Sequence, residues 1–217
     1  LNEIAEELIH KFGVKSSFKH YRPEKGIPPY PAALCTSLND EVVHGVPSRD
    51  RILKEGDILG LDLGIWHKNL CTDSAVTVSV GDVPKDVKKL ISTTEESLYK
   101  GIKEAVVGNT MGDIGFAVAQ IIESSGFSVV RDLVGHGVGH GVHEEPQIPN
   151  YGQKGKGEKL RAGMVLAIEP MVAMGDWRIK ECKNDIFGYC TQDGSLSAHF
   201  EHTIAVTENG PEILTRA

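Results

Sequence analysis

The segment L-K-E-G-D-I-L-G-L-D at residues 53–62 is echoed later by L-R-A-G-M-V-L-A-I-E at residues 160–169. Both place a basic residue and then a glycine before an apolar strand, which ends on a carboxylate, Asp62 or Glu169. The strands that follow also match, because D-x-x-V-x-V at 73–78 parallels E-x-x-I-x-V at 201–206. One match could arise by chance, whereas two in the same register predict two similar halves related by a pseudo-twofold axis.

The halves cover about residues 1–81 and 84–210 of one domain that is expected to span residues 1–217. Helical periodicity predicts helices at 1–12, 84–107 and 113–125. A hairpin of strands 58–65 and 74–80 is expected around His67-Lys68-Asn69. Further strands are expected at 128–133, 164–174, 177–183, 187–191 and 197–207, with irregular surface chain at 15–31 and 151–163. This order of elements predicts an α+β fold.

The two halves differ in their helices. The second half has two helices before its strands, whereas the first has only the helix at 1–12. Because Gly126-Phe127 after helix 113–125 echoes Gly13-Val14 after helix 1–12, the helix without a counterpart is 84–107. We therefore expect one more helix to be encoded before Leu1.

Composition narrows the class of protein. The net charge of −7 argues against a nucleic-acid or anionic-membrane surface, both of which favour a basic face. No apolar run approaches the roughly 20 residues that cross a bilayer, and no signal-peptide pattern is present. The four cysteines, Cys35, Cys71, Cys182 and Cys190, contain no C-x-x-C pair and are too sparse for a disulfide framework. A reducing cytoplasm is therefore the expected location.

The stretch V-G-H-G-V-G-H-G-V-H-E-E-P at residues 134–146 holds three histidines and two glutamates. Its alternating glycines disfavour a helix, because each interior glycine costs on the order of 1 kcal/mol relative to alanine. In an extended chain His136 and His143 would lie ~20 Å or more apart, so one metal could bind both only if the chain folded back. We expect a strand and turn whose histidines have different roles. A glycine-rich surface loop with incidental histidines is the alternative.

Four carboxylates lie within or beside apolar strands: Asp62, Asp73, Glu169 and Glu201. Such acids are rarely buried unless they are paired or bind a metal. A salt bridge would explain any one of them, but together they outnumber the basic residues of their strands. With one histidine from 134–146 they would form a site for two divalent ions about 3–4 Å apart. This oxygen-rich set suits Co²⁺, Mn²⁺, Fe²⁺ or Zn²⁺ and differs from a thiolate zinc site.

These motifs resemble those of the methionine aminopeptidases with the pita-bread fold, over nearly the whole chain. The matching motifs are N-D-E-V-V-H-G-V-P (39–47), D62 with T-D-S (72–74), G-H-G-V-G (135–139), V-H-E-E-P (142–146), I-E-P (168–170) and F-E-H-T (200–203). The resemblance implies a curved antiparallel sheet covered by helices. It also implies removal of the initiator methionine from nascent proteins with a small second residue. No insertion like that of type II members is evident, so the chain resembles type I.

The resemblance further implies a role for each matched residue. The five metal ligands would be Asp62, Asp73, His136, Glu169 and Glu201. Two of them, Asp73 and Glu201, would bridge the ions. Glu169 would also be the general base toward an activated water, and His143 would donate a hydrogen bond to the developing oxyanion. His44 would contact the nitrogen of the leaving residue. His44 and His143 could instead be packing or capping residues, and His140 has no counterpart and is expected to be structural.

Substrate and partners follow from the same resemblance. The pocket would be lined by Tyr30, Cys35, Val142 and Phe187, beside His44 and His143. These residues would form an apolar slot for an unbranched thioether side chain. Asn39 and Ser197 match positions around a monovalent cation. The implied partners are nascent polypeptide N-termini and the ribosome surface, with no DNA and no membrane, for a chain that acts as a monomer.

Three other interpretations stay open on the sequence alone. A prolidase or Xaa-Pro aminopeptidase shares the fold but usually carries an additional N-terminal domain. A non-catalytic binding protein on this scaffold would generally lack some of the five ligands, all of which are present. The third is a pseudo-enzyme whose site is intact but which folds poorly without the missing helix.

Overall fold

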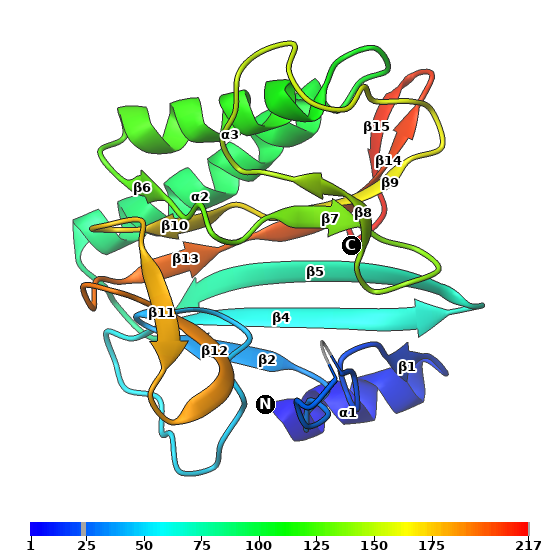
Figure 1. Cartoon of the computed structure of the whole chain (residues 1–217). Coiled ribbons are helices and arrows are strands. Elements are labelled where there is room, and N and C mark those ends of the chain that lie inside the picture. Colours follow the sequence, from blue (N-terminus) through cyan, green and yellow to red (C-terminus); the bar gives the residue numbers. More distant parts are fainter. Residues whose placement is uncertain (23–24, 217) are drawn as a thin grey trace.

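The computed structural model describes residues 1–22 and 25–216, which form two groups of strands separated by a pair of helices (Figure 1). The helices are α1 (Asn2–Lys11), α2 (Lys85–Glu104) and α3 (Met111–Ser124). The strands before α2 are β1 (Lys15–Ser16), β2 (Cys35–Leu38), β3 (Glu41–Val43), β4 (Ile58–His67) and β5 (Leu70–Ser79). Those after α3 are β6 (Ser128–Val129), β7 (Gly135–Gly137), β8 (Glu144–Ile148), β9 (Val165–Ile168), β10 (Met171–Ala173), β11 (Ile179–Cys182), β12 (Asp185–Thr191), β13 (Ser197–His199), β14 (Glu201–Thr207) and β15 (Gly210–Ile213). The predicted α+β class is confirmed, although positions 23–24 of the predicted irregular segment lie outside the described residues.

One large antiparallel sheet organises the molecule. Its strand order is β1-β4-β5-β14-β9-β7-β8, with β2 also paired to β4 and β15 to β14. The two segments that match in sequence form its centre, because β4 pairs with β5, β9 pairs with β14, and β5 and β14 pair with each other. This arrangement confirms the predicted pseudo-twofold repeat.

The helices cover the sheet unequally. In Figure 1, α2 and α3 lie together over the upper part of the sheet, whereas α1 lies at the opposite end beside β1. The core under α2 and α3 is fully buried, and it includes Leu90, Ile114, Val118, Leu166 and Ile168. By contrast, α1 leaves Leu1, Ile4, Leu8 and Phe12 exposed. The expectation of a helix before Leu1 concerns residues outside this chain and stays a prediction.

Local chemistry explains several boundaries. The β4–β5 hairpin is longer than predicted and turns at Lys68 and Asn69, which have φ of 47° and 66°. Asparagine tolerates this left-handed region better than most residues. Helix α3 begins two residues before its predicted start, because Thr110 and Asp113 form a capping box.

Two predicted long strands are each divided into two. The predicted strand 164–174 breaks at Glu169-Pro170, where proline has no N–H for the ladder. The predicted strand 197–207 breaks at Phe200. The pieces β10 and β13 belong to a separate sheet of order β13-β10-β6. The chain therefore passes between the two sheets after β9 and again before β14. Glu169 and Glu201 lie at these two points. The predicted strand 128–133 pairs only over β6.

The expectation about cysteines was wrong in one respect. Cys182 and Cys190 are bonded to each other across the hairpin of β11 and β12. Eight positions separate them, with their Cα atoms 5.3 Å apart, so a hairpin can join them without a larger framework. Cys35 and Cys71 are free and buried. In the described part of the chain, no helix is long and apolar enough to cross a membrane.

Candidate metal centre and active site

Five neighbouring strands of the large sheet each carry one predicted ligand. In the sheet order β4, β5, β14, β9 and β7, these residues are Asp62, Asp73, Glu201, Glu169 and His136. Glu169 follows the last residue of β9, and the other four lie within their strands. Residues far apart in the sequence therefore meet in one row across the sheet.

The register places these side chains on one face. Residues directly opposite each other in antiparallel strands share a face, as do residues two positions apart. Ala75 lies opposite both Asp62 and Glu201, and Asp73 precedes it by two positions.

The same logic continues across the next two strands. Ile168 lies opposite His202, so the following residue, Glu169, comes level with Glu201. Ala167 lies opposite His136 and precedes Glu169 by two positions. All five donors consequently project from one face of the sheet.

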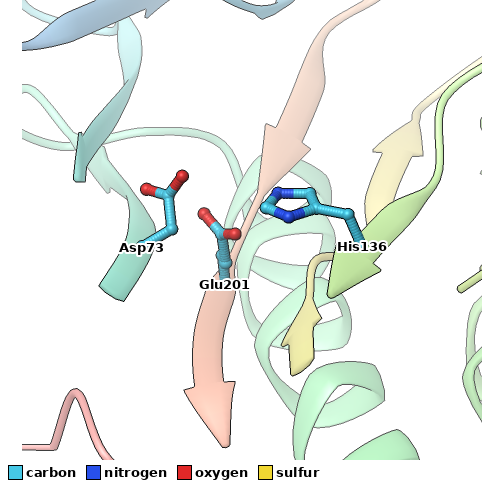
Figure 2. Close-up of side chains that lie close together, drawn as sticks. All are labelled: Asp73, His136 and Glu201. Carbon is cyan, nitrogen blue, oxygen red and sulfur yellow. The ribbon is translucent and has the colours of Figure 1, made fainter. Parts of the chain in front are cut away.

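The side chains converge where β5, β14 and β7 meet. Ligand atoms of Asp73, His136 and Glu201 all lie within 4.8 Å of one another, and all three residues are buried. Figure 2 shows the carboxyl groups of Asp73 and Glu201 side by side, with the imidazole of His136 next to Glu201. Glu169 adjoins this group, because its Oε1 lies 3.5 Å from Nε2 of His136.

Crowding of carboxylates dominates the electrostatics. Burial and the neighbouring carboxylates raise the pKa of Asp62 and of Glu201 well above the usual values. Burial, with the charge of Glu169, raises the pKa of Asp73 to about 7. Burial likewise raises the pKa of Glu169 to about 7, against the opposing effect of His136. Four acids so placed need a counter-charge in order to be ionised together.

The described residues do not supply that counter-charge. None of the four carboxylates forms an ion pair with a described lysine or arginine, so the salt-bridge explanation fails there. Asp62 Oδ1 and Glu201 Oε1 are buried without a hydrogen-bond partner among the described residues. Such orphaned oxygens are the donors that a divalent cation would satisfy.

His136 has the tautomer that a metal ligand needs. Its Nδ1 lies 2.9 Å from the carbonyl oxygen of Gly137, which can only accept a hydrogen bond, so Nδ1 carries the proton. The lone pair of Nε2 therefore faces the carboxylates. Four carboxylates and one neutral imidazole fit Mn²⁺, Fe²⁺, Co²⁺ or Zn²⁺.

The glycine-rich stretch folds back as the sequence requires. Strands β7 and β8 pair as a hairpin, in which Gly137 lies opposite Glu144. The rings of His136 and His143 are consequently only 4.5 Å apart between centroids. His140 is exposed and is not among the residues that line the cavity at the carboxylates, and its structural role stays a prediction.

An apolar cavity of about 270 Å³ opens onto the carboxylates. Of the predicted pocket residues, Tyr30, Cys35, Phe187, His44 and His143 line it. Tyr30 and Phe187 meet edge to face, with centroids 5.2 Å apart. Val142 is buried in the same apolar cluster as Tyr30 and Cys35, without being among the residues that line this cavity. Its role in the pocket stays a prediction.

Sequence reasoning missed several residues of the site. The cavity is also lined by Phe18, Tyr21, Ile27, Leu133, Ile186 and Tyr189. His199 is buried, and its Nε2 lies 3.3 Å from Oε2 of Glu169. Burial lowers the pKa of His199 to about 3, so the imidazole is neutral at pH 7. Its position in S-A-H-F-E, two residues before Glu201, was the only available signal.

The two positions predicted to surround a monovalent cation, Asn39 and Ser197, are also adjacent. The backbone N–H of Ser197 donates to the carbonyl oxygen of Asn39 at 2.9 Å. Asn39 has a left-handed φ of 57°, and its side-chain amide bonds to Asp57. The structure thus brings Asn39 and Ser197 together, while the monovalent cation stays a prediction.

The fold and site are similar to those of known proteins. The model of "Metallopeptidase family M24" matches residues 1–208. A methionine aminopeptidase of Clostridium perfringens is 50% identical over 99% of this chain and 83% of its own length. The crystal structure of methionine aminopeptidase from Thermotoga maritima superimposes with a TM-score of 0.94 at 48% identity, covering 100% of this chain and 84% of that one.

A prolidase structure is also similar, at lower identity. A prolidase from Pyrococcus horikoshii matches with a TM-score of 0.67 at 26% identity, over 85% of this chain and 48% of its own. Likeness to the bacterial aminopeptidases extends over most of both chains, whereas likeness to the prolidase covers about half of the longer protein. The pita-bread fold expected from the motifs is confirmed by these structures.

Proposed function

The chain belongs to metallopeptidase family M24, and from this membership we propose that it is a methionine aminopeptidase. It removes the N-terminal methionine of polypeptides by metal-dependent hydrolysis. One observation carries this function: four carboxylates and an imidazole from five adjacent strands converge under an apolar cavity.

The metal ligands of this proposal are Asp62, Asp73, His136, Glu169 and Glu201. Asp73 and Glu201, which come from the two central strands, would be shared between two ions. When bound, a pair of divalent ions supplies Lewis acidity and lowers the pKa of a water toward neutrality. The orphaned oxygens of Asp62 and Glu201 support this assignment.

The remaining chemistry belongs to side chains around the cavity. Glu169, as general base, takes a proton from the attacking water and later passes it to the leaving amine. His143, at the edge of the cavity, donates a hydrogen bond to the oxyanion that develops on the scissile carbonyl. His44 contacts the nitrogen of the leaving residue. Desolvation and the charges of His199 and His136 lower the pKa of His44 to about 4, so it acts as a neutral imidazole.

The methionine side chain packs against the apolar wall formed by Tyr30, Cys35 and Phe187. Cys35 lies opposite Asp62 in the β2–β4 pair, which brings this wall directly beside the carboxylates. Nascent polypeptide N-termini are the natural substrates of such a site. We place the activity in the cytoplasm, near the ribosome, in a single domain that acts as a monomer.

A peptide panel tests this function. We expect the metal-loaded chain to release methionine from Met-Ala-Ser, much more slowly from Met-Lys-Ser, and to leave Ala-Pro intact. Release of free methionine is followed by chromatography. Cleavage of Ala-Pro without cleavage of Met-Ala-Ser would support the Xaa-Pro peptidase instead, and no bound metal after reconstitution would support a binding protein.

Substituting His143 isolates the proposed oxyanion donor. We expect His143→Ala to lower kcat on Met-Ala-Ser by roughly 10²-fold or more while metal content stays unchanged. His140→Ala is the matched control, because this exposed histidine lies three positions earlier in the same turn. If His143→Ala and His140→Ala changed kcat equally, His143 would have no specific role in the mechanism.

Substituting Phe187 tests the wall of the cavity. We expect Phe187→Ala to raise KM for Met-Ala-Ser by about 10- to 100-fold and to change kcat little, because it removes apolar contact with the substrate. Phe12→Ala, on the exposed face of α1, should leave both constants unchanged. A loss confined to kcat in Phe187→Ala would show that the ring does not serve binding.

A further inference from the structure

Tyr21 makes a contact that the proposed function does not use. Its hydroxyl lies 2.8 Å from Nδ1 of His143, although 122 positions separate the two residues. Their rings meet edge to face with centroids 5.3 Å apart. Tyr21 is half-buried and lines the cavity between Phe18 and Tyr30.

The backbone holds Tyr21 in this position. Its N–H donates to the carbonyl oxygen of Phe18 at 2.8 Å, and its own carbonyl accepts from the N–H of Tyr30 at 2.8 Å. Tyr30 in turn anchors its hydroxyl on the carbonyl oxygen of Gly45 at 2.9 Å. The phenol is therefore tied through its backbone to Tyr30, one of the residues of the apolar wall.

The direction of this hydrogen bond depends on the tautomer of His143. In the described part of the chain, the hydroxyl of Tyr21 has no partner other than His143. Burial raises the pKa of Tyr21, so the phenol keeps its proton at pH 7. A hydroxyl can donate to Nδ1 or accept from it, and it donates when the ring proton of a neutral His143 is on Nε2, as the proposed oxyanion donor requires.

The neighbouring imidazole shows the opposite arrangement. His136 carries its proton on Nδ1, because that atom faces the carbonyl oxygen of Gly137. With its ring proton on Nε2, His143 would present an N–H there, whereas His136, whose ring centroid lies 4.5 Å away, presents a lone pair. A lone pair suits a metal ligand, whereas an N–H suits an oxyanion donor.

We propose that Tyr21 is a positioning residue that fixes His143 as the Nε2–H tautomer and orients its ring at the cavity. This role rests on the proposed function, because the tautomer matters for catalysis only if His143 donates to an oxyanion. Tyr21 acts through His143 and not as a proton donor to the substrate.

The first test reads the tautomer directly, without turnover. Long-range ¹H–¹⁵N correlation spectra of the full chain loaded with Zn²⁺ report which imidazole nitrogen carries the proton, and His143→Ala identifies the signals. We expect Nε2–H for His143 in the wild type and a mixture of both tautomers in Tyr21→Phe. A wild type with Nδ1–H, or an unchanged spectrum in Tyr21→Phe, would overturn the proposal.

The second test is a double-mutant cycle on Met-Ala-Ser. We expect Tyr21→Phe to lower kcat by about 5- to 20-fold, with KM within about twofold, because one hydrogen bond to the ring is lost. In the His143→Ala background, Tyr21→Phe should have no further effect. Multiplicative losses in the double variant would show that Tyr21 acts independently of His143, which contradicts the proposal.

A matched control exists elsewhere in the chain. Tyr99 also places its hydroxyl on a histidine, 3.3 Å from Nε2 of His202, but lies outside the cavity. We expect Tyr99→Phe to leave kcat and the tautomer of His143 unchanged. A wild-type chain without turnover would refute the proposed function, whereas an active chain whose His143 tautomer is insensitive to Tyr21→Phe would refute only the role of Tyr21.

Discussion

Glu169→Gln should lower kcat on Met-Ala-Ser by about 10³- to 10⁴-fold and retain most of the bound metal. Glutamine keeps the shape of the side chain and one carbonyl oxygen as a possible ligand, but it cannot take a proton from water. The neighbouring His136 and His199 lie 3.5 and 3.3 Å from the carboxylate and stay in place. Steady-state kinetics and metal analysis by mass spectrometry measure the two quantities separately.

The control for this substitution is Glu95→Gln on the exposed side of α2, which changes the same chemistry away from the site. It should leave kcat within twofold of the wild type. If Glu169→Gln lost metal and activity in parallel, Glu169 would be a ligand without a demonstrable role as base. If it kept full activity, another residue would have to be the base.

Removing the metals should abolish turnover and also reverse the response of stability to pH. In the metal-free chain the pKa values of Asp73 and Glu169 are both about 7, compared with roughly 4 in an unfolded chain. The folded chain then binds more protons than the unfolded one near neutrality, so the free energy of unfolding falls as pH rises through 7. We expect the melting temperature of the metal-free chain to fall by roughly 5–10 °C between pH 6 and 8.

Histidines limit the window in which this effect is visible. Burial lowers the pKa of His44 to about 4 and of His199 to about 3. Below pH 6.5 the unfolded chain therefore gains protons on histidines that the folded chain does not take up, which opposes the carboxylate effect. Between pH 6 and about 7 this uptake offsets part of the carboxylate effect, so most of the fall in stability between pH 6 and 8 is expected above pH 7.

Calorimetry with and without metal decides the point. The loaded chain should be at least as stable at pH 8 as at pH 6, because protonation competes with ions for the same carboxylates. The metal-free Glu169→Gln variant should show a weaker pH dependence than the metal-free wild type, since one titrating group is gone. Identical slopes in loaded and metal-free wild type would contradict a metal site at these carboxylates.

The central sheet was predictable because its signal is periodic. The matched segments that end on Asp62 and Glu169 are apolar runs that finish on acids, and each is followed by a second strand that carries an acid, so the equivalence of the two halves follows from the pattern. The alternating glycines around His136 indicated a chain that is not helical and can fold back, but only the family resemblance singled out His136 from the three histidines.

Residues that depend on long-range packing were not predictable. Tyr21 meets His143 across 122 positions, and nothing in its local sequence indicates that contact. His199 lies beside Glu169 only because β10 and β13 leave the large sheet together. The position of His199 depends on the strand breaks at Glu169-Pro170 and Phe200, which the apolar runs in the sequence do not indicate.

The Cys182–Cys190 bond means that the amino-acid sequence alone does not define this protein chemically. The bond closes a loop that contains Ile186, Phe187 and Tyr189, all of which line the cavity. A dithiol in the buffer would reduce this bond to two thiols and would itself become a disulfide. The loop would then regain the conformational freedom that the bond removes. Preparations made with and without such a reductant therefore differ in the covalent structure of this loop, and their activities should be compared. The redox treatment of a sample should be stated together with its metal content.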